Sequence, residues 1–137
     1  VQADLWDGDP DIDAMCRLSK SPLVKYDTYE PYGSSQLSPF NSQNTFIARE
    51  ALPYYMMLPF IGRMDDIWGS YLLQQKFPNS VIYNKATVYQ DRNVQDLVKN
   101  LEEECIGYRH TLDLLEGNYS LPKKTSAPYE IYKKSFL

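Results

Sequence analysis

Apolar residues recur every three or four positions from residue 94 to residue 115, which is the period of one helical face. Asn93 stands where a helix cap is favoured, and Gly117 follows the last apolar position. The pattern predicts a long helix whose apolar face packs on the core. That face consists of Val94, Leu97, Val98, Leu101, Cys105, Tyr108, Leu112 and Leu115. His110 lies off this face, which indicates a surface or boundary position.

Two shorter helices are predicted before it. Residues 65–76 open with two carboxylates, which are favoured in a first turn because free backbone N–H groups lie there. Residues 12–19 follow a turn, and Asp11 is the expected cap. The residues of this short helix that we expect to face inward are Ile12, Met15, Cys16 and Leu18.

Two segments are rich in β-branched and aromatic residues, which favour strands. Residues 44–49 are apolar at their centre and predict a buried strand, and residues 80–89 predict a second one. Residues 23–26 suit a shorter strand inside a long loop over residues 21–44, and residues 54–60 are apolar enough to be core. The sequence therefore predicts an α/β fold in which a mixed sheet is flanked by helices.

The charge and length of the chain exclude some classes of protein. The chain has 137 residues, enough for one domain with a core, and its formal net charge of -4 argues against binding nucleic acid. No apolar run reaches the roughly 18 residues needed to cross a membrane. Nothing at the amino end looks like a signal peptide. Because Val1 has no preceding methionine, we expect the natural chain to continue upstream.

Cysteine and tyrosine add two weaker indications. Cys16 and Cys105 are far apart and predict free core thiols, which suggests a reducing compartment. The twelve tyrosines suit a surface that grips sugars or peptides, and equally a small core with wet edges.

The densest candidate chemistry lies between Gly62 and Leu73. Asp65 and Asp66 have two interpretations. In one, both carboxylates serve only the helix end. In the other, one caps the helix while its neighbour faces a cleft and handles a substrate hydroxyl.

A second acidic stretch has aspartates at alternate positions from residue 7 to residue 13. An EF-hand would need glycine and glutamate where Ile12 and Leu18 stand, so that site is excluded. The triplet Asp7-Gly8-Asp9 spells Asp-X-Asp, which can hold a divalent cation on a nucleotide diphosphate. The same triplet is also common in ordinary turns.

Four segments occur in the order found in one known family. Residues 62–68 match Gly-Arg-X-Asp-Asp-X-Trp, and residues 5–14 are similar to Leu-Trp…Pro-Asp-Tyr-Asp-Ala. Residues 44–49 stand where that family has Asn-Leu-Ala-Phe-Asp-Arg, and residues 82–86 resemble Ile-Tyr-His-Ser-Lys-Ala. Over roughly residues 4–115 the chain thus resembles the plant reversibly glycosylated polypeptides, the UDP-arabinopyranose mutases.

This resemblance implies the second, acceptor-side half of a GT-A nucleotide-sugar transferase fold over residues 1–116. Residues 117–137 are expected to form a tail that drapes over the domain or is partly ordered, and its expected anchors are Tyr129, Ile131, Tyr132 and Phe136. The metal-holding Asp-X-Asp of such folds belongs to an upstream half. The resemblance therefore implies Mn²⁺ or Mg²⁺ in a full-length protein and assigns no metal ligand to this chain.

The resemblance also suggests roles for individual residues. Asp65 or Asp66 would contact sugar hydroxyls, and one would act as general base. Arg63 would pair with the diphosphate or orient the carboxylates, and Trp68 would form a wall of the site or belong to the core. Further substrate-binding candidates are Asp7, Asp9 and Asn84. Asn84 replaces the family's histidine and is a poorer transition-metal ligand.

The sequence thus favours a glycosyltransferase-like domain that acts on a nucleotide-activated sugar and a carbohydrate or protein acceptor. The alternatives are a non-catalytic transferase-like binding or assembly module, and an unrelated small α/β domain. A cytoplasmic or Golgi-associated location is expected, and a homo-oligomer is left open. If the resemblance holds, the strands at residues 45–49 and 81–88 should share one sheet, with Asp65 and Asp66 at its edge.

Overall fold

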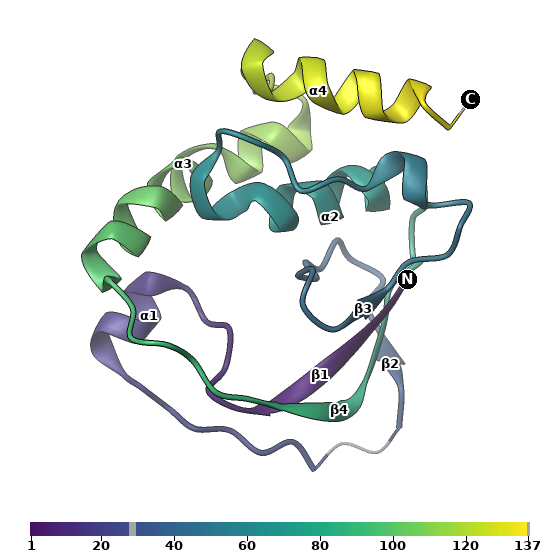
Figure 1. Cartoon of the computed structure of the whole chain (residues 1–137). Helices are drawn as coiled ribbons and strands as arrows, with labels where there is room; N and C mark the ends of the chain where they lie inside the picture. Colours follow the sequence, from purple (N-terminus) through teal and green to yellow (C-terminus); the bar gives the residue numbers. More distant parts are fainter. Residues whose placement is uncertain (28–29, 137) are drawn as a thin grey trace.

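The computed structural model describes residues 1–27 and 30–136. It is an α/β fold in which α2 lies over a small sheet and α4 lies farther out, while α1 packs near the start of α3 (Figure 1). The strands are β1 (Gln2–Gly8), β2 (Tyr32–Gly33), β3 (Thr45–Phe46) and β4 (Ile82–Gln90). The helices are α1 (Ala14–Ser19), α2 (Asp65–Lys76), α3 (Leu97–Glu116) and α4 (Lys123–Lys134), with 3₁₀ turns η1 (Leu52–Tyr54) and η2 (Gly62–Met64).

The sheet is open and mixed, with strand order β2-β4-β1-β3. β1 and β4 run parallel, whereas β3 pairs antiparallel with β1 and β2 antiparallel with β4. The prediction that strands from residues 45–49 and 81–88 share one sheet is confirmed for Thr45–Phe46 and Ile82–Gln90, and β1 lies between these two strands. The prediction of a buried strand over 44–49 is wrong, because β3 is only two residues long and Phe46 is 65% exposed.

β1 was not predicted from the sequence, because polar residues interrupt its apolar pattern. Asp4 is only 5% exposed in this strand. Its two carboxylate oxygens accept hydrogen bonds from Gln2 Nε2 at 2.7 Å and Thr87 Oγ1 at 3.1 Å. A buried carboxylate is tolerated where hydrogen bonds replace its lost hydration. The Gln2 bond lies within β1, whereas the Thr87 bond joins β1 to β4 by side chains as well as backbone.

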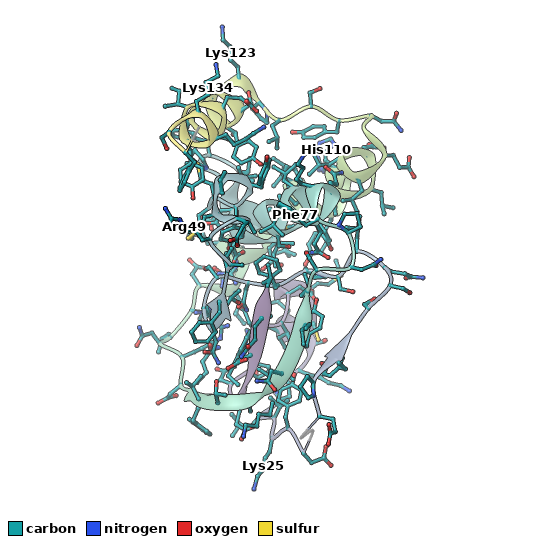
Figure 2. The ribbon with its side chains drawn as sticks, turned by 90° about the vertical axis from the view of Figure 1, so that its right-hand side faces the viewer. Lys25, Arg49, Phe77, His110, Lys123 and Lys134 are labelled. Atoms are coloured by element: carbon teal, nitrogen blue, oxygen red, sulfur yellow. The ribbon has the colours of Figure 1, made fainter. Side chains whose placement is uncertain are left out.

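α2 has the bounds that the sequence predicts, and it separates two apolar clusters. Leu73 packs toward the sheet with Phe40 and Val81, whereas Trp68 packs toward α3 and α4. Figure 2 shows the same layering from the side, with Phe77 and His110 in the helical layer and Lys25 at the far end of the sheet. The start of α2 is thus fixed between the sheet and the outer helices.

α3 begins later than predicted, because Asp96 rather than Asn93 caps it by accepting from the Lys99 N–H at 3.0 Å. It ends at Glu116 as predicted, with Gly117 in the left-handed region at φ 79°. The predicted inward face is wrong in part: its exposed members are Val94, Val98, Tyr108 and Leu112, whereas Leu97, Leu101, Cys105 and Leu115 are half-buried.

The buried face of α3 instead holds Glu104, Gly107 and Leu114. Gly107 lets the helix approach Met64, since a Cβ there would lie 2.3 Å from the Met64 sulfur. Apolar periodicity does not detect a face built on a glycine and a paired carboxylate. His110 is half-buried and stacks on Tyr119 with ring centroids 4.3 Å apart, as expected for a boundary position.

α1 is shorter than predicted, and Asp13 rather than Asp11 caps it by accepting from the Cys16 N–H at 2.9 Å. Its buried residues are Ala14 and Arg17, so the predicted inward set is wrong: Met15 is 60% exposed, and Cys16 and Leu18 are exposed as well. Ile12 lies before the helix and is half-buried. A core thiol is therefore wrong for Cys16, while Cys105 is half-buried.

The segment after Gly117 contains a helix, α4, that belongs to the core. Tyr129 is 8% exposed and joins the outer apolar cluster, and Tyr132 donates from its hydroxyl to the Leu52 carbonyl at 2.9 Å. These two predicted anchors are confirmed. The predictions for Ile131 and Phe136 are wrong, because they are 71% and 47% exposed.

Other segments follow their predictions in part. In residues 54–60, Leu58 is buried but Met57 and Phe60 are 51% and 66% exposed. In the loop over residues 21–44, the predicted strand at 23–26 is reduced to one bridge between Val24 and Gly8. Thr28 and Tyr29 of this loop, and Leu137 at the end of the predicted tail, lie outside the described residues.

Candidate active site

A cavity of about 730 Å³ opens at the start of α2. Its walls come from the segment after β1, the loop before β3, the η2 turn and the middle of α3. Most of the polar side chains around it are charged. The charged side chains are those of Asp11, Asp13, Arg63, Asp65, Asp66, Arg92, Glu103 and Glu104. Ser42, Gln43, Tyr108 and Thr111 contribute uncharged polar groups.

Asp65 combines a local role with a place in the cavity wall. Its Oδ1 accepts from the Asp66 backbone N–H at 2.9 Å, which satisfies one of the free N–H groups of the first turn. The side chain is half-buried and lines the cavity. Asp65 thus satisfies an N–H of the first turn although the N-cap position is Met64, which has no side-chain cap hydrogen bond, and the same carboxylate also lines the cavity.

Asp66 is held by a different part of the chain. Its Oδ2 accepts from the Ser42 backbone N–H at 3.0 Å and from the Ser42 hydroxyl at 3.3 Å. Burial raises the pKa of Asp66, and the nearby carboxylates of Asp65 and Asp11 add to that rise, while the Ser42 N–H opposes it. A carboxylate with a raised pKa binds an incoming proton more strongly than an ordinary one.

The phenol of Tyr55 lies behind this carboxylate. Its hydroxyl is buried without a hydrogen-bond partner among the described residues. The pKa of Tyr55 is raised by burial and further by the charges of Asp66 and Asp65, so the group stays neutral.

Arg63 is fixed by Glu104 on α3, 41 residues away in sequence. Its Nε donates to Glu104 Oε1 at 2.9 Å. The other carboxylate oxygen of Glu104 accepts from the Ala14 N–H at 2.7 Å and the Tyr108 hydroxyl at 2.8 Å. Glu104 is 6% exposed, so this carboxylate joins η2, α1 and α3 inside the wall. Among the described residues Arg63 forms an ion pair with Glu104 and with neither Asp65 nor Asp66, so its two predicted roles, pairing with a diphosphate or orienting those two carboxylates, stay predictions.

Arg92 is a wall residue that sequence reasoning missed. Its side chain is 10% exposed, and its guanidinium donates to Asp11. Its Nε lies 4.0 Å from Asp9 Oδ1, too far for a hydrogen bond, and has no other partner among the described residues. The sequence holds no signal for this residue, because its partners are about 80 positions away. Arg92 fixes Asp11 at the cavity edge.

The remaining predicted site residues lie elsewhere. Trp68 is fully buried and donates from Nε1 to Thr111 Oγ1 at 3.0 Å, so it supports the wall from the core. Asp7 Oδ1 accepts from the Tyr26 N–H at 2.7 Å, and Asp9 pairs with Arg17 at 2.7 Å. Asn84 lies opposite Asp4 in the register of the parallel strands β1 and β4. The cavity thus unites Arg63, Asp65 and Asp66, and does not include these four.

The described residues do not fit a metal ion. Over residues 1–27 and 30–136, no group of three or more histidine, cysteine or acidic side chains is placed to hold one. Asp7 and Asp9 are instead engaged with the Tyr26 backbone and the Arg17 side chain. We therefore derive no step that passes through a metal ion bound by this chain.

The described part of the chain also has no helix long and apolar enough to cross a membrane. Comparison with known proteins adds no family. No family model matches the chain, and no curated protein matches its sequence.

Proposed function

We propose that the chain is a glycosyltransferase-like domain that supplies the acceptor side of a nucleotide-sugar transferase. The observation that carries the proposal is the pair Asp65 and Asp66 in the wall of a charged cavity, with Asp66 held across the site by Ser42. The open mixed sheet with its helices is an α/β fold, the general class that the proposal requires. The proposal also uses the ordered motif resemblance around residues 62–68.

In the proposed reaction, Asp66 is the general base. As an acceptor hydroxyl attacks the anomeric carbon of the donor sugar, its proton passes to the Asp66 carboxylate. The bond from the anomeric carbon to the phosphate oxygen breaks, and the nucleoside diphosphate leaves with that electron pair. Positioned general bases contribute roughly 10²–10⁴-fold to rate. The raised pKa of Asp66 suits this role.

Asp65 and Arg63 position the acceptor. Asp65 accepts hydrogen bonds from sugar hydroxyls. The bond from the Asp66 N–H to Asp65 Oδ1 fixes the orientation of the Asp65 carboxylate. The side chain of Arg63 is 29% exposed while its Nε is tied to Glu104, so its outer nitrogens can donate into the cavity. A sugar hydroxyl both donates and accepts, which matches a wall of carboxylates and guanidinium groups.

Substitution of the two aspartates tests the enzymatic proposal. In the protein produced from its complete gene, Asp66→Asn should remove sugar transfer from a panel of UDP-sugars while circular dichroism and thermal unfolding stay close to those of the parent. Asp65→Asn should reduce transfer. Ser19→Ala, on the exposed end of α1, is the matched control and should leave transfer unchanged. Full activity in both aspartate variants would end the assignment.

A non-catalytic transferase-like module is the second candidate. The observations that favour it are Asn84 in place of the family's histidine and the lack of a metal-holding cluster among the described residues. Titration of UDP-sugars with and without Mn²⁺, on the same complete-gene protein, separates the two. No binding under any condition favours the module, and sugar transfer excludes it.

A further inference from the structure

We infer that the acceptor is an uncharged oligosaccharide of at least two sugar units, one in the cavity and the next against Trp6. This inference rests on the proposed function and names the substrate class of the same site. Two independent observations carry it. One is the charge of the cavity wall, and the other is a second hollow that adjoins it.

The cavity wall is acidic. Six carboxylates face two guanidinium groups, a formal excess of four negative charges. Both cations are already paired, Arg63 with Glu104 and Arg92 with Asp11. A phosphate or carboxylate group on a ligand would therefore meet a net excess of like charge, because each guanidinium already shares its charge with a wall carboxylate. The cavity suits hydroxyl groups, and the donor's diphosphate must bind outside it.

The second hollow, of about 200 Å³, shares Asp11, Pro39 and Ile67 with the cavity. The two spaces therefore lie next to each other on either side of these residues. The lining of the smaller hollow includes the half-buried rings of Trp6 and Tyr83, which do not line the cavity. A ligand that fills the cavity and extends past Pro39 reaches these rings.

The second hollow combines aromatic rings with fixed polar groups. The Tyr83 hydroxyl donates to the Pro39 carbonyl at 2.7 Å, and Asn41 Nδ2 donates to Asp11 Oδ2 at 3.0 Å. These bonds hold both side chains before any ligand binds, which lowers the entropic cost of binding. A pyranose ring presents an apolar C–H face to an aromatic ring and hydroxyls to polar groups at its edge. The hollow therefore suits one sugar unit.

Tryptophan fluorescence tests the inference directly. Within these 137 residues the two tryptophans are Trp6 and the fully buried Trp68, so the emission change that is present in the parent and absent in Trp6→Phe reports Trp6. The complete-gene protein is titrated with glucose, galactose, maltose, cellobiose and lactose, and with glucose 6-phosphate as the charged probe. We expect at least one disaccharide to bind about tenfold more tightly than its monosaccharide and to shift the emission. Glucose 6-phosphate should bind more weakly than glucose.

Variants at residue 6, measured by isothermal calorimetry, test whether Trp6 provides the extra affinity for the disaccharide. Trp6→Ala should remove the preference for the disaccharide while monosaccharide affinity stays within about twofold, and Trp6→Phe should keep most of the preference because a ring remains. Equal affinity for monosaccharide and disaccharide, or a preference that survives Trp6→Ala, overturns the inference and leaves the proposed function standing. Tighter binding of the sugar phosphate also overturns it. If no sugar binds, the proposed function fails as well.

Discussion

The backbone N–H of Ser42 donates to Asp66 Oδ2 at 3.0 Å, which ties the loop before β3 to the first turn of α2. Asp65 meanwhile accepts from the N–H at the start of that helix. Two adjacent carboxylates in one helical turn therefore have different partners. Asp65 serves the helix end, and Asp66 joins the helix to a separate loop at the cavity edge.

This geometry predicts a pH dependence that belongs to Asp66. Because the folded pKa of Asp66 is raised, the folded state holds its proton more tightly than the unfolded chain. The resulting stability is full below the ordinary pKa of an aspartate, and it is lost as pH rises through the raised folded value. Asp66→Asn should remove this component.

Urea unfolding of the parent and of Asp66→Asn at several pH values from 3 to 8 measures the pH-dependent stability that Asp66 contributes. The parent should lose stability relative to the variant as pH rises across the acidic range, and at pH 7 the two should differ by no more than about 1 kcal/mol. Other titrating groups cancel in the difference between the two proteins. Parallel stability curves would show that Asp66 titrates normally.

Glu104 predicts a large structural effect. Glu104→Ala would leave the Ala14 N–H and the Arg63 guanidinium without their acceptor, so the free energy of unfolding should fall by about 2–4 kcal/mol. The neighbouring Glu103 is the matched control, since its side chain is 39% exposed and its ion pair with Lys99 is 3.9 Å long. Glu103→Ala should cost less than about 1 kcal/mol. Similar losses in both variants would contradict the role of Glu104.

Two helical glycines provide a matched pair for packing. Alanine is favoured over glycine in a helix interior by about 1 kcal/mol, so helix propensity alone predicts that a Gly→Ala substitution stabilises the protein at both positions. A Cβ on Gly69 would lie 2.5 Å from the Met56 carbonyl oxygen, which is backbone, whereas one on Gly107 meets only the flexible side chain of Met64. Gly69→Ala should therefore destabilise by about 1–3 kcal/mol, and Gly107→Ala should change stability by less than about 1 kcal/mol. Thermal unfolding of both variants decides, and a gain in Gly69→Ala would contradict this packing.

The sequence predicts best the elements that local signals define. The bounds of α2 follow from an acidic first turn and a Pro78 stop, and β4 follows from its β-branched residues. Where a polar residue belongs to the core, the same signals fail. The polar Asp4 interrupts the apolar pattern of β1, so the strand is not predicted. On α3 the buried face includes Glu104, and Val98 therefore faces outward. In both cases the compensating partner comes from a distant part of the chain.

The candidate site shows the same division. Asp65, Asp66 and Arg63 are adjacent in sequence, so a motif could identify them. Glu104 and Arg92 join them only through the fold, because their contacts span 41 and 81 positions. Nothing local distinguishes these two residues from charges on a solvated helix or loop.

The outer helix provides the last prediction, on whether residues after Gly117 are part of the folded unit. Tyr129 is 8% exposed in the outer apolar cluster, and its hydroxyl donates to the Tyr54 carbonyl at 3.2 Å. Tyr129→Ala should therefore lower the free energy of unfolding by about 3–5 kcal/mol, as removal of a buried aromatic side chain usually does. Ile131, two residues along the same helix, is 71% exposed, so Ile131→Ala should stay within about 0.5 kcal/mol. Urea denaturation of both variants measures the difference. A small loss in Tyr129→Ala would mean that α4 is peripheral, because the cluster around Trp68 would then be stable without it.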